Sequence, residues 1–407
     1  MNSPKFENKG TRYCFEWPEV KCVISRIKQN QEHTNSQLLF ETIDNSHILR
    51  TRLNLEASSS KSRLAKDLSE LLSLKKDTWQ DIVEYISEKS LRELEQGEPV
   101  IEITSRDDTT PLEYIIYPVL PKGKPTVIFG DPGSAKSQQA VLFSIMMALP
   151  WHDNPMRLKV NDSPSVPLFL DYEADPDDVR RQVTSLVNGM NLGYMRLHYR
   201  RCTLPLHEDI EAIMNHADVI KADCLIIDST SLAAGNDLNK MEAASNYFRA
   251  LRQTHLTTLS LSHTSKDRES KSKTIIGSVL WEAGARSVWE SRVVESEDCL
   301  DVALFHRKSN LARKSPPIGF QIHYENDLPV NVIWHDSSSV PEFIERMGNN
   351  KRILELLKGG SLTTKEMTEG LEISYAAAGV ALKRMASKNL VIKLPDGKSW
   401  GLPAYDS

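Results

Sequence analysis

A loop rich in glycine and proline follows an apolar stretch near residue 130, and its residues are of the types that bind phosphate. The apolar residues 127–129 precede the loop, and a helix-like apolar stretch, 140–149, follows it. The loop consists of Gly130, Asp131, Pro132, Gly133, Ser134, Ala135, Lys136, Ser137 and Gln138. In loops between a strand and a helix of this kind, backbone N–H groups and the helix N-terminus face phosphate oxygens. We therefore predict that residues 130–138 bind a nucleotide.

Two side chains of this loop have specific predicted roles, and one residue departs from the usual pattern. Lys136 is expected to reach the β- and γ-phosphates, and the Ser137 hydroxyl to ligate Mg²⁺. Ala135 stands where such loops usually carry a second glycine. A methyl group is tolerable at a helical dihedral but crowds the backbone where phosphate approaches, so hydrolysis is expected to suffer more than binding. The alternative is an ordinary turn between a strand and a helix.

Two apolar runs further along the chain end in carboxylates. The first ends at Asp171 and Glu173, and the second ends at Asp228. A carboxylate after the first run is expected to orient or deprotonate an attacking water, with Glu173 as the first choice and Asp171 as the second. Asp228 is expected to hold the hydration shell of Mg²⁺. The alternatives are a solvated acidic loop at the first position and a capping Asp-Ser pair at the second.

A third apolar run ends at His263, and a basic loop follows it. His263 is expected to lie beside the γ-phosphate and to report its presence to the loop, although a lone histidine is as often a core or surface residue. The cations of the loop, residues 264–278, are Lys266, Arg268, Lys271 and Lys273. A basic loop rich in hydroxyl groups suits the backbone of single-stranded DNA. Because Asp267 and Glu269 dilute its charge, a solvated surface loop is the alternative.

Cations also cluster after the next strand-like stretch. Arg307 and Lys308 follow it directly. Either side chain is a candidate for a catalytic cation that reaches the nucleotide of a neighbouring subunit.

The pattern of apolar residues indicates which elements carry these groups. From about residue 101 to 336, strand-like runs alternate with helical patterns, which predicts an α/β fold with a mostly parallel sheet. We expect residues 1–100 to form a small region of strands and then helices whose role is unknown. Its cations Arg50, Arg52, Lys61 and Arg63 fit either DNA contact or subunit docking. Residues 337–346 are expected to be a linker to a last block, 347–407.

The ordered set of motifs resembles the RecA-fold P-loop ATPases, in particular the RepA-type AAA ATPases related to plasmid replicative helicases. The resemblance rests on residues 130–137, 170–173, 226–229, 261–264, 277–278 and 308–310. It implies that ATP and Mg²⁺ bind at Lys136 and Ser137, with Glu173 as catalytic carboxylate, Asp228 on the metal side and His263 as γ-phosphate sensor. It also implies a ring, usually a hexamer, with nucleotide between subunits and the basic loop on single-stranded DNA. The arginine finger is one of Arg286, Arg307, Lys308 and Arg313.

The last block shows three helical patterns followed by a hairpin pattern, which resembles a winged helix-turn-helix. Lys383 and Arg384 on the third helix suit contact with DNA phosphates. The run 376–378 is all alanine and leaves few side chains for reading base edges, so weakly specific contact is expected. Docking of a protein partner is the alternative.

Length and composition limit the class of protein. The 407 residues allow two or three domains, and a formal net charge of −5 argues against a wholly basic nucleic-acid coat. Five dispersed cysteines and a polar N-terminus suggest a cytoplasmic protein that does not enter membranes. The leading hypothesis is an ATP-dependent motor on single-stranded DNA in replication or repair, for example of a mobile element. The alternative is a regulatory or loader ATPase that binds DNA or a protein through its winged helix without unwinding. A metabolic kinase fits poorly, because no acceptor-substrate lid is evident.

Overall fold

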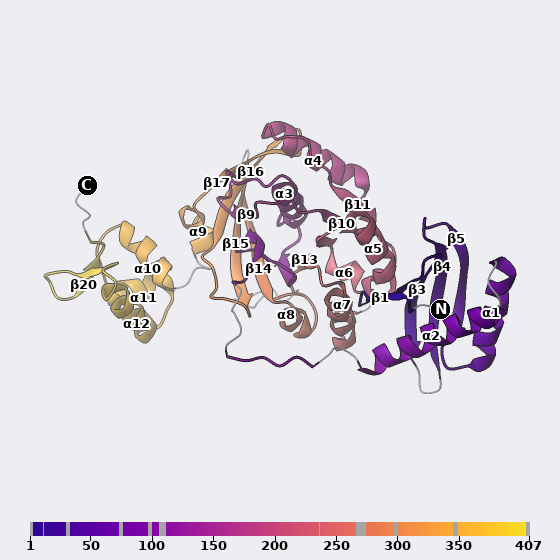
Figure 1. Cartoon of the computed structure of the whole chain (residues 1–407). Helices are drawn as coiled ribbons and strands as arrows, with labels where there is room; N and C mark the ends of the chain where they lie inside the picture. Colours follow the sequence, from indigo (N-terminus) through magenta and orange to yellow (C-terminus); the bar gives the residue numbers. More distant parts are fainter. Residues whose placement is uncertain are drawn as a thin grey trace. The chain divides into compact units, whose positions relative to one another are not determined.

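The computed structural model describes residues 3–10, 12–29, 33–72, 76–96, 100–105, 111–235, 237–265, 274–296, 299–344 and 349–403. The chain divides into two compact units. Figure 1 labels their helices and strands. The first unit comprises residues 1–112, 204–222 and 245–256, and the second comprises residues 113–203, 223–244 and 257–407.

The first unit begins with an antiparallel sheet covered by two helices. The strands follow one another in chain order: β1 (Lys5–Asn8), β2 (Tyr13–Glu16), β3 (Val20–Gln29), β4 (Thr34–Thr42) and β5 (His47–Asn54). Helices α1 (Ser58–Leu71) and α2 (Lys76–Gln96) follow. Alternate strand residues such as Phe15 and Phe40 form one core with Trp79 of α2, so the period of two places apolar side chains on one face of the sheet. Helices α5 (Leu206–Ile220) and α7 (Met241–Thr254) also contribute to this unit.

The second unit contains a sheet of nine strands, six of which run parallel. Their order is β11 (His198–Arg201), β10 (Pro167–Asp171), β12 (Cys224–Asp228), β13 (Thr257–His263), β8 (Pro125–Gly130), β14 (Ser287–Glu295), β15 (Cys299–Ser309), β16 (Ile318–Glu325) and β17 (Leu328–Trp334). The pairs from β11 to β14 are parallel and those from β14 to β17 are antiparallel. The mostly parallel sheet predicted from the sequence is therefore confirmed, and this architecture fits a RecA-like core. The antiparallel extension was not predicted.

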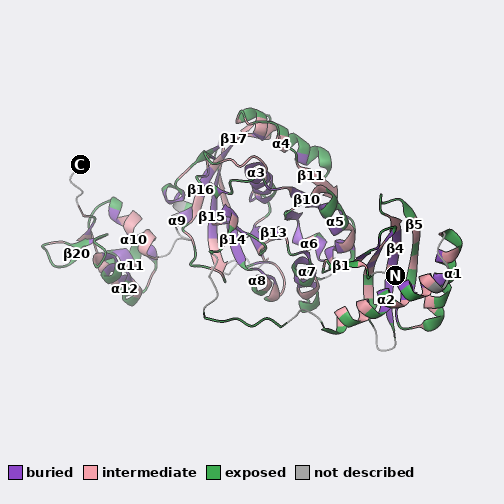
Figure 2. Cartoon of the chain, in the orientation of Figure 1, coloured by how far each residue is buried: buried purple, intermediate pink, exposed green. Residues whose placement is uncertain are grey.

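The central strands are buried on both faces, as the purple strands of Figure 2 show. Every residue of β10 and β12 is buried, which is why these strands are continuous apolar runs without alternation. Helix α3 (Lys136–Ala148) contributes Phe143 and Met146 to the same core. The unit also contains α4 (Pro176–Gly189), α6 (Thr230–Ala233), α8 (Leu280–Gly284) and a small sheet of β6 (Tyr114–Tyr117), β7 (Leu120–Pro121) and β9 (Lys159–Val160).

The polar run after β17, within the predicted linker, forms local structure. Residues Ser337–Ser339 make a 3-10 turn in which Ser337 and Ser338 are buried, and the Asp336 carboxylate accepts a hydrogen bond from the Ser338 N–H. Helix α9 (Pro341–Ile344) follows. These hydrogen bonds explain why a polar sequence can still be ordered.

The last block has three helices and a three-stranded sheet. The helices are α10 (Asn349–Lys358), α11 (Thr364–Leu371) and α12 (Tyr375–Ala386), and the strands are β18 (Leu362–Thr363), β19 (Ile392–Lys393) and β20 (Ser399–Gly401). Ile353, Met367, Leu382 and Met385 form its core. The three helices and the hairpin lie where the sequence predicted them. In the part of the chain that the structure describes, no helix is both long and apolar enough to cross a membrane.

Candidate active site

The carboxyl ends of four parallel strands bring the sequence-predicted residues to one place. The register pairs His263 at the end of β13 with Gly130 at the end of β8, and Asp171 of β10 with Asp228 of β12. Lys136, Glu173, Asp228 and His263 line one cleft with a volume of about 1110 Å³. Crevices at the carboxyl ends of strands are where open α/β sheets bind ligands.

Two glycines of the loop between β8 and α3 have different surroundings. There is no room for a side chain at Gly130, whereas Gly133 faces open space. A Cβ atom at Gly130 would lie 2.4 Å from Ser134 Oγ and 2.6 Å from the Ser291 carbonyl oxygen. Gly133 has a φ of 79°, and a Cβ atom there would have no neighbour within 4 Å. The backbone at Gly133 is thus open to a ligand, as a phosphate-binding loop requires.

Ala135 adopts a backbone conformation that glycine would adopt at less cost. Its φ is 55° and its ψ is 23°, which is the left-handed region, immediately before the first residue of α3. A non-glycine residue costs roughly 1 to 2 kcal/mol there. The sequence analysis expected a methyl group to be tolerable here because the backbone would be helical. The backbone is in the left-handed helical region instead, where a methyl group is costly.

Lys136 is buried and bonded to its own loop. Its Nζ donates hydrogen bonds to the carbonyl oxygens of Gly130 (3.2 Å) and Asp131 (2.8 Å) and to Ser134 Oγ (3.2 Å). Burial lowers the pKa of Lys136, and the charges of Asp228, Glu173 and Asp131 oppose that effect. The ammonium group therefore lies at the base of the loop, surrounded by acceptors.

Two residues that the sequence analysis did not identify, Gln139 and Ser291, also hold the phosphate loop by hydrogen bonds. The Ser134 carbonyl oxygen accepts hydrogen bonds from Gln139 Nε2 (3.0 Å) and from Ser291 Oγ (2.8 Å), and Gln139 also donates to Ser291 Oγ (2.7 Å). Gln139 and Ser291 are fully buried. Ser291 lies on β14, far away in the sequence, so no local pattern signals it.

The two carboxylates after β10 have different surroundings. Asp171 Oδ1 accepts hydrogen bonds from the N–H groups of Glu173 and Ala174 (both 2.9 Å), and Oδ2 accepts one from the Tyr199 hydroxyl (3.1 Å). Asp171 is therefore a buried anchor of the turn. Glu173 faces the cleft, where Ser229 Oγ donates to its Oε1 and His263 Nε2 lies 3.8 Å from the same oxygen. The hydrogen bonds from His263 and Ser229 lower the pKa of Glu173.

Asp228 is a buried carboxylate beside the first turn of α3. Burial raises the pKa of Asp228 to about 6, and a hydrogen bond from the Ser137 side chain opposes this shift. The charges of Glu173 and Asp171 raise its pKa further. Ser137 and Asp228, expected on either side of Mg²⁺, thus lie in direct contact.

The start of the basic loop is bonded to the phosphate loop. Thr264 Oγ1 donates to Asp131 Oδ1, and the Thr264 N–H donates to the Gly130 carbonyl oxygen (3.2 Å). Thr264 also pairs with Ile275 across the base of the loop. Lys266, Arg268, Lys271 and Lys273, predicted to contact DNA, lie outside the described residues.

The four candidate finger cations divide into two pairs. Arg307 forms an ion pair with the buried Glu290, and Lys308 Nζ donates to the carbonyl oxygens of Glu282, Ala283 and Ala285 at distances of 2.6 to 3.1 Å. Burial lowers the pKa of Lys308. Arg286 and Arg313 are exposed, and within the described part of the chain neither has an ion pair.

The side of the cleft that the antiparallel strands form was not predicted from the sequence. Its apolar residues are Val293, Leu300 and Tyr324, and its polar lining includes Glu295, Ser296, Asn326 and Asp327. The three apolar residues come from β14, β15 and β16, in the antiparallel part of the sheet. Only the fold brings them beside the phosphate loop.

The residues present fit a nucleotide with Mg²⁺. The cleft is large enough for a nucleotide, Gly133 leaves the loop open, and an ammonium group lies at its base. A hydroxyl and a carboxylate, the oxygen ligands that Mg²⁺ prefers, face each other at Ser137 and Asp228.

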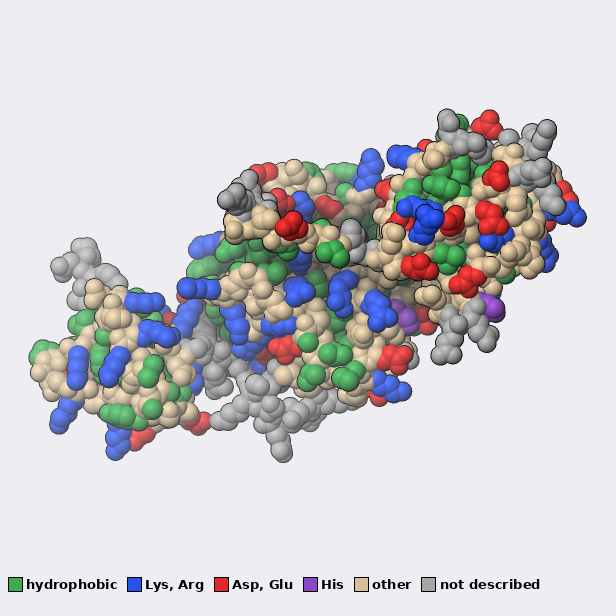
Figure 3. Space-filling view, turned by 60° about the horizontal axis from the view of Figure 1, so that its bottom comes forward, with side chains coloured by type: hydrophobic (Ala, Val, Ile, Leu, Met, Phe, Trp, Pro, Cys, Tyr) green, Lys and Arg blue, Asp and Glu red, His purple; other side chains and the backbone are tan. Residues whose placement is uncertain are grey.

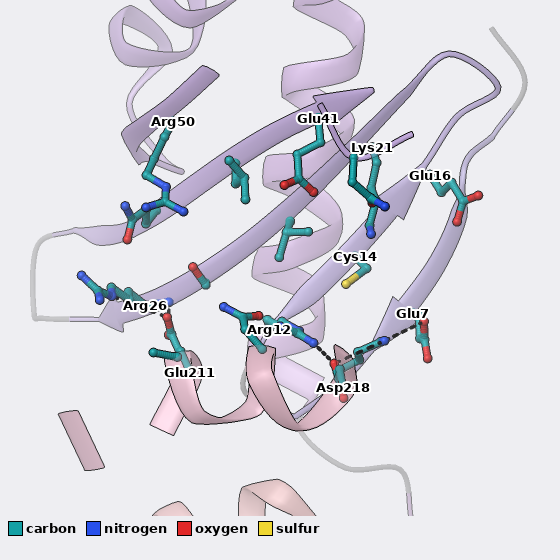
Figure 4. Close-up of a pocket in the computed structure, with 18 of the residues that line it drawn as sticks. Glu7, Arg12, Cys14, Glu16, Lys21, Arg26, Glu41, Arg50, Glu211 and Asp218 are labelled. Atoms are coloured by element: carbon teal, nitrogen blue, oxygen red, sulfur yellow. Dashed lines mark hydrogen bonds and ion pairs between the residues drawn. The ribbon is translucent and has the colours of Figure 1, made fainter. Parts of the chain in front are cut away.

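A second hollow, of about 820 Å³, lies in the first unit between the sheet and α5 (Figure 4). Charged groups of both signs line it. Several neutralise each other: the side chain of Arg12 pairs with Asp218, and the side chain of Arg26 pairs with Glu211. Arg50 faces this hollow, whereas Lys61 pairs with Glu84. No loop with the geometry of residues 130–138 lines this hollow.

In the last block, Lys383 and Arg384 lie in the last turn of α12 and are exposed. Lys and Arg side chains are spread over the surface of this block, on the left of Figure 3. The predicted DNA-contacting cations are thus accessible.

Comparison with known proteins gives one family match and similar solved structures. Residues 91–269 match the family model of the AAA domain called AAA_25. A solved structure of a KaiC-like protein from the hyperthermophilic archaeon Pyrococcus horikoshii is similar, with 16% sequence identity and a TM-score of 0.38 over 55% of this chain and 94% of that chain. A search of curated proteins gave no match.

The matched family segment contains the phosphate loop, Glu173, Asp228 and His263. Together with the loop geometry, this match supports a P-loop ATPase in the central part of the chain.

Proposed function

We propose that this protein is an ATP-hydrolysing motor of the RecA and RepA-like type that acts on single-stranded DNA in replication or repair. The observation that carries the proposal is the bonded path from the phosphate loop to the basic loop. Asp131 and Gly130 accept hydrogen bonds from Thr264. His263, the residue before Thr264, contacts Glu173. A change at the γ-phosphate can therefore move the base of a loop whose composition suits DNA.

Hydrolysis in this proposal uses side chains at four strand ends. Lys136 donates to the β- and γ-phosphate oxygens. Glu173 is ionised near neutral pH because its pKa is lowered, so it accepts a hydrogen bond from the attacking water and orients it. His263, which contacts Glu173, senses whether the γ-phosphate is present. Ser137 and Asp228 would hold Mg²⁺, which neutralises developing charge on the phosphates when bound.

A neighbouring subunit supplies the remaining cation. Arg307 and Lys308 are engaged within the chain, whereas Arg286 and Arg313 are exposed. We assign the finger to Arg286 or Arg313, in a ring with nucleotide between subunits.

The same proposal divides the chain by role. Residues 1–100 serve subunit docking or DNA contact, 101–336 hold the ATPase core, and 337–346 join it to a winged-helix block, 347–407. Three helices with a hairpin, and exposed cations Lys383 and Arg384 on the third helix, support weakly specific contact with DNA phosphates.

The test is steady-state ATP hydrolysis with and without single-stranded DNA. Turnover that DNA stimulates, that Lys136→Ala abolishes, and that loses its stimulation when Lys266, Lys271 and Lys273 are all changed to alanine supports the motor. Turnover that DNA does not change contradicts it.

A second candidate is a slow nucleotide-dependent switch, such as a regulator or loader that binds DNA or a protein without unwinding. Two observations favour it: Ala135 strains the phosphate loop, and Ser229 and His263 both bind Glu173. Ala135→Gly distinguishes the candidates, because a sharp rise in turnover indicates the switch and an unchanged rate indicates the motor.

A further inference from the structure

Strand β17, at one edge of the nine-stranded sheet, ends in two exposed apolar side chains. Ile333 is 45% exposed and Trp334 is 40% exposed. A hollow of about 680 Å³, here called the β17 hollow, lies between this strand end and the loop before β9. Residues 152–155, 157–159 and 332–334 line it. Adjacent exposed apolar side chains beside a hollow indicate a surface that contacts a ligand or partner.

The loop on the other side of the β17 hollow is held by its own hydrogen bonds. Asn154 is buried, and its side chain donates to the carbonyl oxygens of Trp151 (2.8 Å) and Leu158 (2.7 Å). Met156 and Leu158 pack into the core, and Arg157 between them is exposed with a φ of 55°. A positive φ is unfavourable for arginine. The loop therefore holds Arg157 at the surface against a local cost, which is common where a residue has a function.

Arg157 and Trp334 form a stacked pair at the β17 hollow. The guanidinium carbon of Arg157 lies over the indole ring, 3.9 Å from its centroid. The described residues contain no ion pair to Arg157 and no hydrogen bond from its side chain, so its N–H groups are available to a ligand. Nucleic-acid bases stack on aromatic rings and on the planes of arginine side chains.

The charges around the β17 hollow favour a phosphate backbone as the ligand. Arg157, Lys159 and His152 line it together with one acid, Asp153. His152 Nε2 lies 3.7 Å from Asp162 Oδ1, whereas no acid of the described part of the chain forms an ion pair with Lys159. Unpaired cations beside an aromatic ring are the composition of sites that bind single strands without reading their sequence. An acidic peptide would contact the cations but would gain little from the stacked pair.

We propose that the β17 hollow binds single-stranded nucleic acid. One base stacks on the pair of Arg157 and Trp334, and Lys159 binds a phosphate next to that base. The inference rests on the proposed function for its partner, a single strand, but it assigns contact to a surface outside both the basic loop and α12. Because this surface lies on the sheet edge, its affinity for the strand is expected not to require ATP.

The test compares a normal oligonucleotide with an abasic one of the same length, which has the phosphates but no bases. Dissociation constants of the full chain would be measured by fluorescence anisotropy at low salt and without nucleotide. Trp334→Ala is expected to weaken the normal oligonucleotide by about fivefold or more and to change the abasic one by less than about twofold. Arg157→Lys keeps the charge but not the plane, so the same pattern is expected. Trp334→Phe keeps a ring and is expected to retain most of the affinity.

Two further measurements separate base stacking from charge. Lys159→Ala is expected to weaken both oligonucleotides alike and to reduce the slope of affinity against salt by about one. Tyr194→Ala and Arg196→Ala are the matched controls, because both residues are exposed and neither lines the β17 hollow. Both controls are expected to bind the two oligonucleotides as the unchanged protein does.

Other results overturn the inference. Equal losses for the two oligonucleotides in Trp334→Ala, or no loss for either, mean that no base stacks on Trp334. Binding of a polyglutamate peptide that depends on Trp334 as strongly means that the hollow binds acidic polypeptides instead. Trp334→Leu keeps an apolar side chain and replaces Trp334→Ala if that variant does not fold.

The same measurements distinguish this inference from the proposed function. Binding of the normal oligonucleotide that depends on Trp334, without any stimulation of ATP turnover by DNA, supports the inference and contradicts the motor. Stimulated turnover with no dependence of binding on Trp334 refutes the inference alone. No binding of a single strand by the unchanged protein refutes both.

Discussion

At the scale of single residues, each of three charged side chains of the cleft has a polar partner. Lys136 donates to loop carbonyls, Asp228 contacts Ser137, and Glu173 is bonded by Ser229. Burying these charges near each other is costly unless each has a partner. These partners stabilise the buried charges, so we expect small steric or charge changes in the cleft to have large effects.

Gly130→Ala is expected to abolish ATP binding or weaken it at least a hundredfold. The new methyl group would lie within 2.6 Å of Ser134 Oγ and of the Ser291 carbonyl oxygen, so the loop would have to move. Gly193→Ala is the control, because a Cβ atom there meets nothing within 4 Å. Dissociation constants for ATP would be compared, and near-equal values for the two variants would contradict the steric argument.

Asp228→Asn is expected to change how stability depends on pH. The pKa of Asp228 is raised from 3.8 to about 6, so between these values the folded protein binds more protons than the unfolded chain. Its free energy of unfolding therefore falls as pH rises through this window, by about 3 kcal/mol at most. Asn cannot ionise, so the stability of the variant relative to the unchanged protein rises from pH 4 to pH 7.

Urea unfolding at several pH values would measure this difference. A constant difference between the two proteins would show that the pKa of Asp228 is not raised by folding.

At the scale of elements, the ends of β8 and β13 carry the connection between cleft and basic loop. Their register places His263 beside Gly130, and Thr264 follows with bonds to both Gly130 and Asp131. Strand ends are rigid compared with loops, so a shift at one strand end is passed to the other.

Thr264→Val is expected to reduce DNA stimulation of ATP turnover by about tenfold while changing the affinity for ATP little. Valine has a similar shape but cannot donate to Asp131, so the hydrogen bond to a charged acceptor is lost. Ser265→Ala is the control, because the Ser265 hydroxyl contacts Thr274 and not the phosphate loop. If both variants retain full stimulation, the signal travels by another route.

At the scale of the whole molecule, net charge and local charge differ. The chain is acidic overall, yet exposed cations lie on α12, and the sequence of residues 264–278 contains four further cations. Local cations can bind DNA phosphates even on an acidic protein, because screening limits electrostatic forces to short distances.

Subunit mixing would test whether a neighbour supplies the catalytic cation. One of Arg286→Ala and Arg313→Ala is expected to lower turnover by about a hundredfold or more. Mixed with inactive Lys136→Ala subunits, that variant should regain turnover, because one subunit type supplies an intact phosphate loop and the other an intact arginine. Turnover that does not recover for either arginine variant would argue against a finger at these two positions.

Much of the fold could be predicted because its signals are local. Asp171 and Asp228 each end a continuous apolar run, and strands buried on both faces have that pattern wherever they occur. The antiparallel strands β15 to β17 were missed as part of the sheet, because their pairing depends on contacts that no short stretch of sequence contains.

The sequence by itself determined the phosphate loop, the acidic strand ends and the mostly parallel α/β class, because each depends on residues that are neighbours in the chain. The tertiary structure alone decided three further features. Ser291 supports the phosphate loop from β14, Tyr324 lines the cleft from β16, and Arg307 and Lys308 are engaged within the chain. These features depend on which strands lie side by side, and long-range packing of the whole core sets that order.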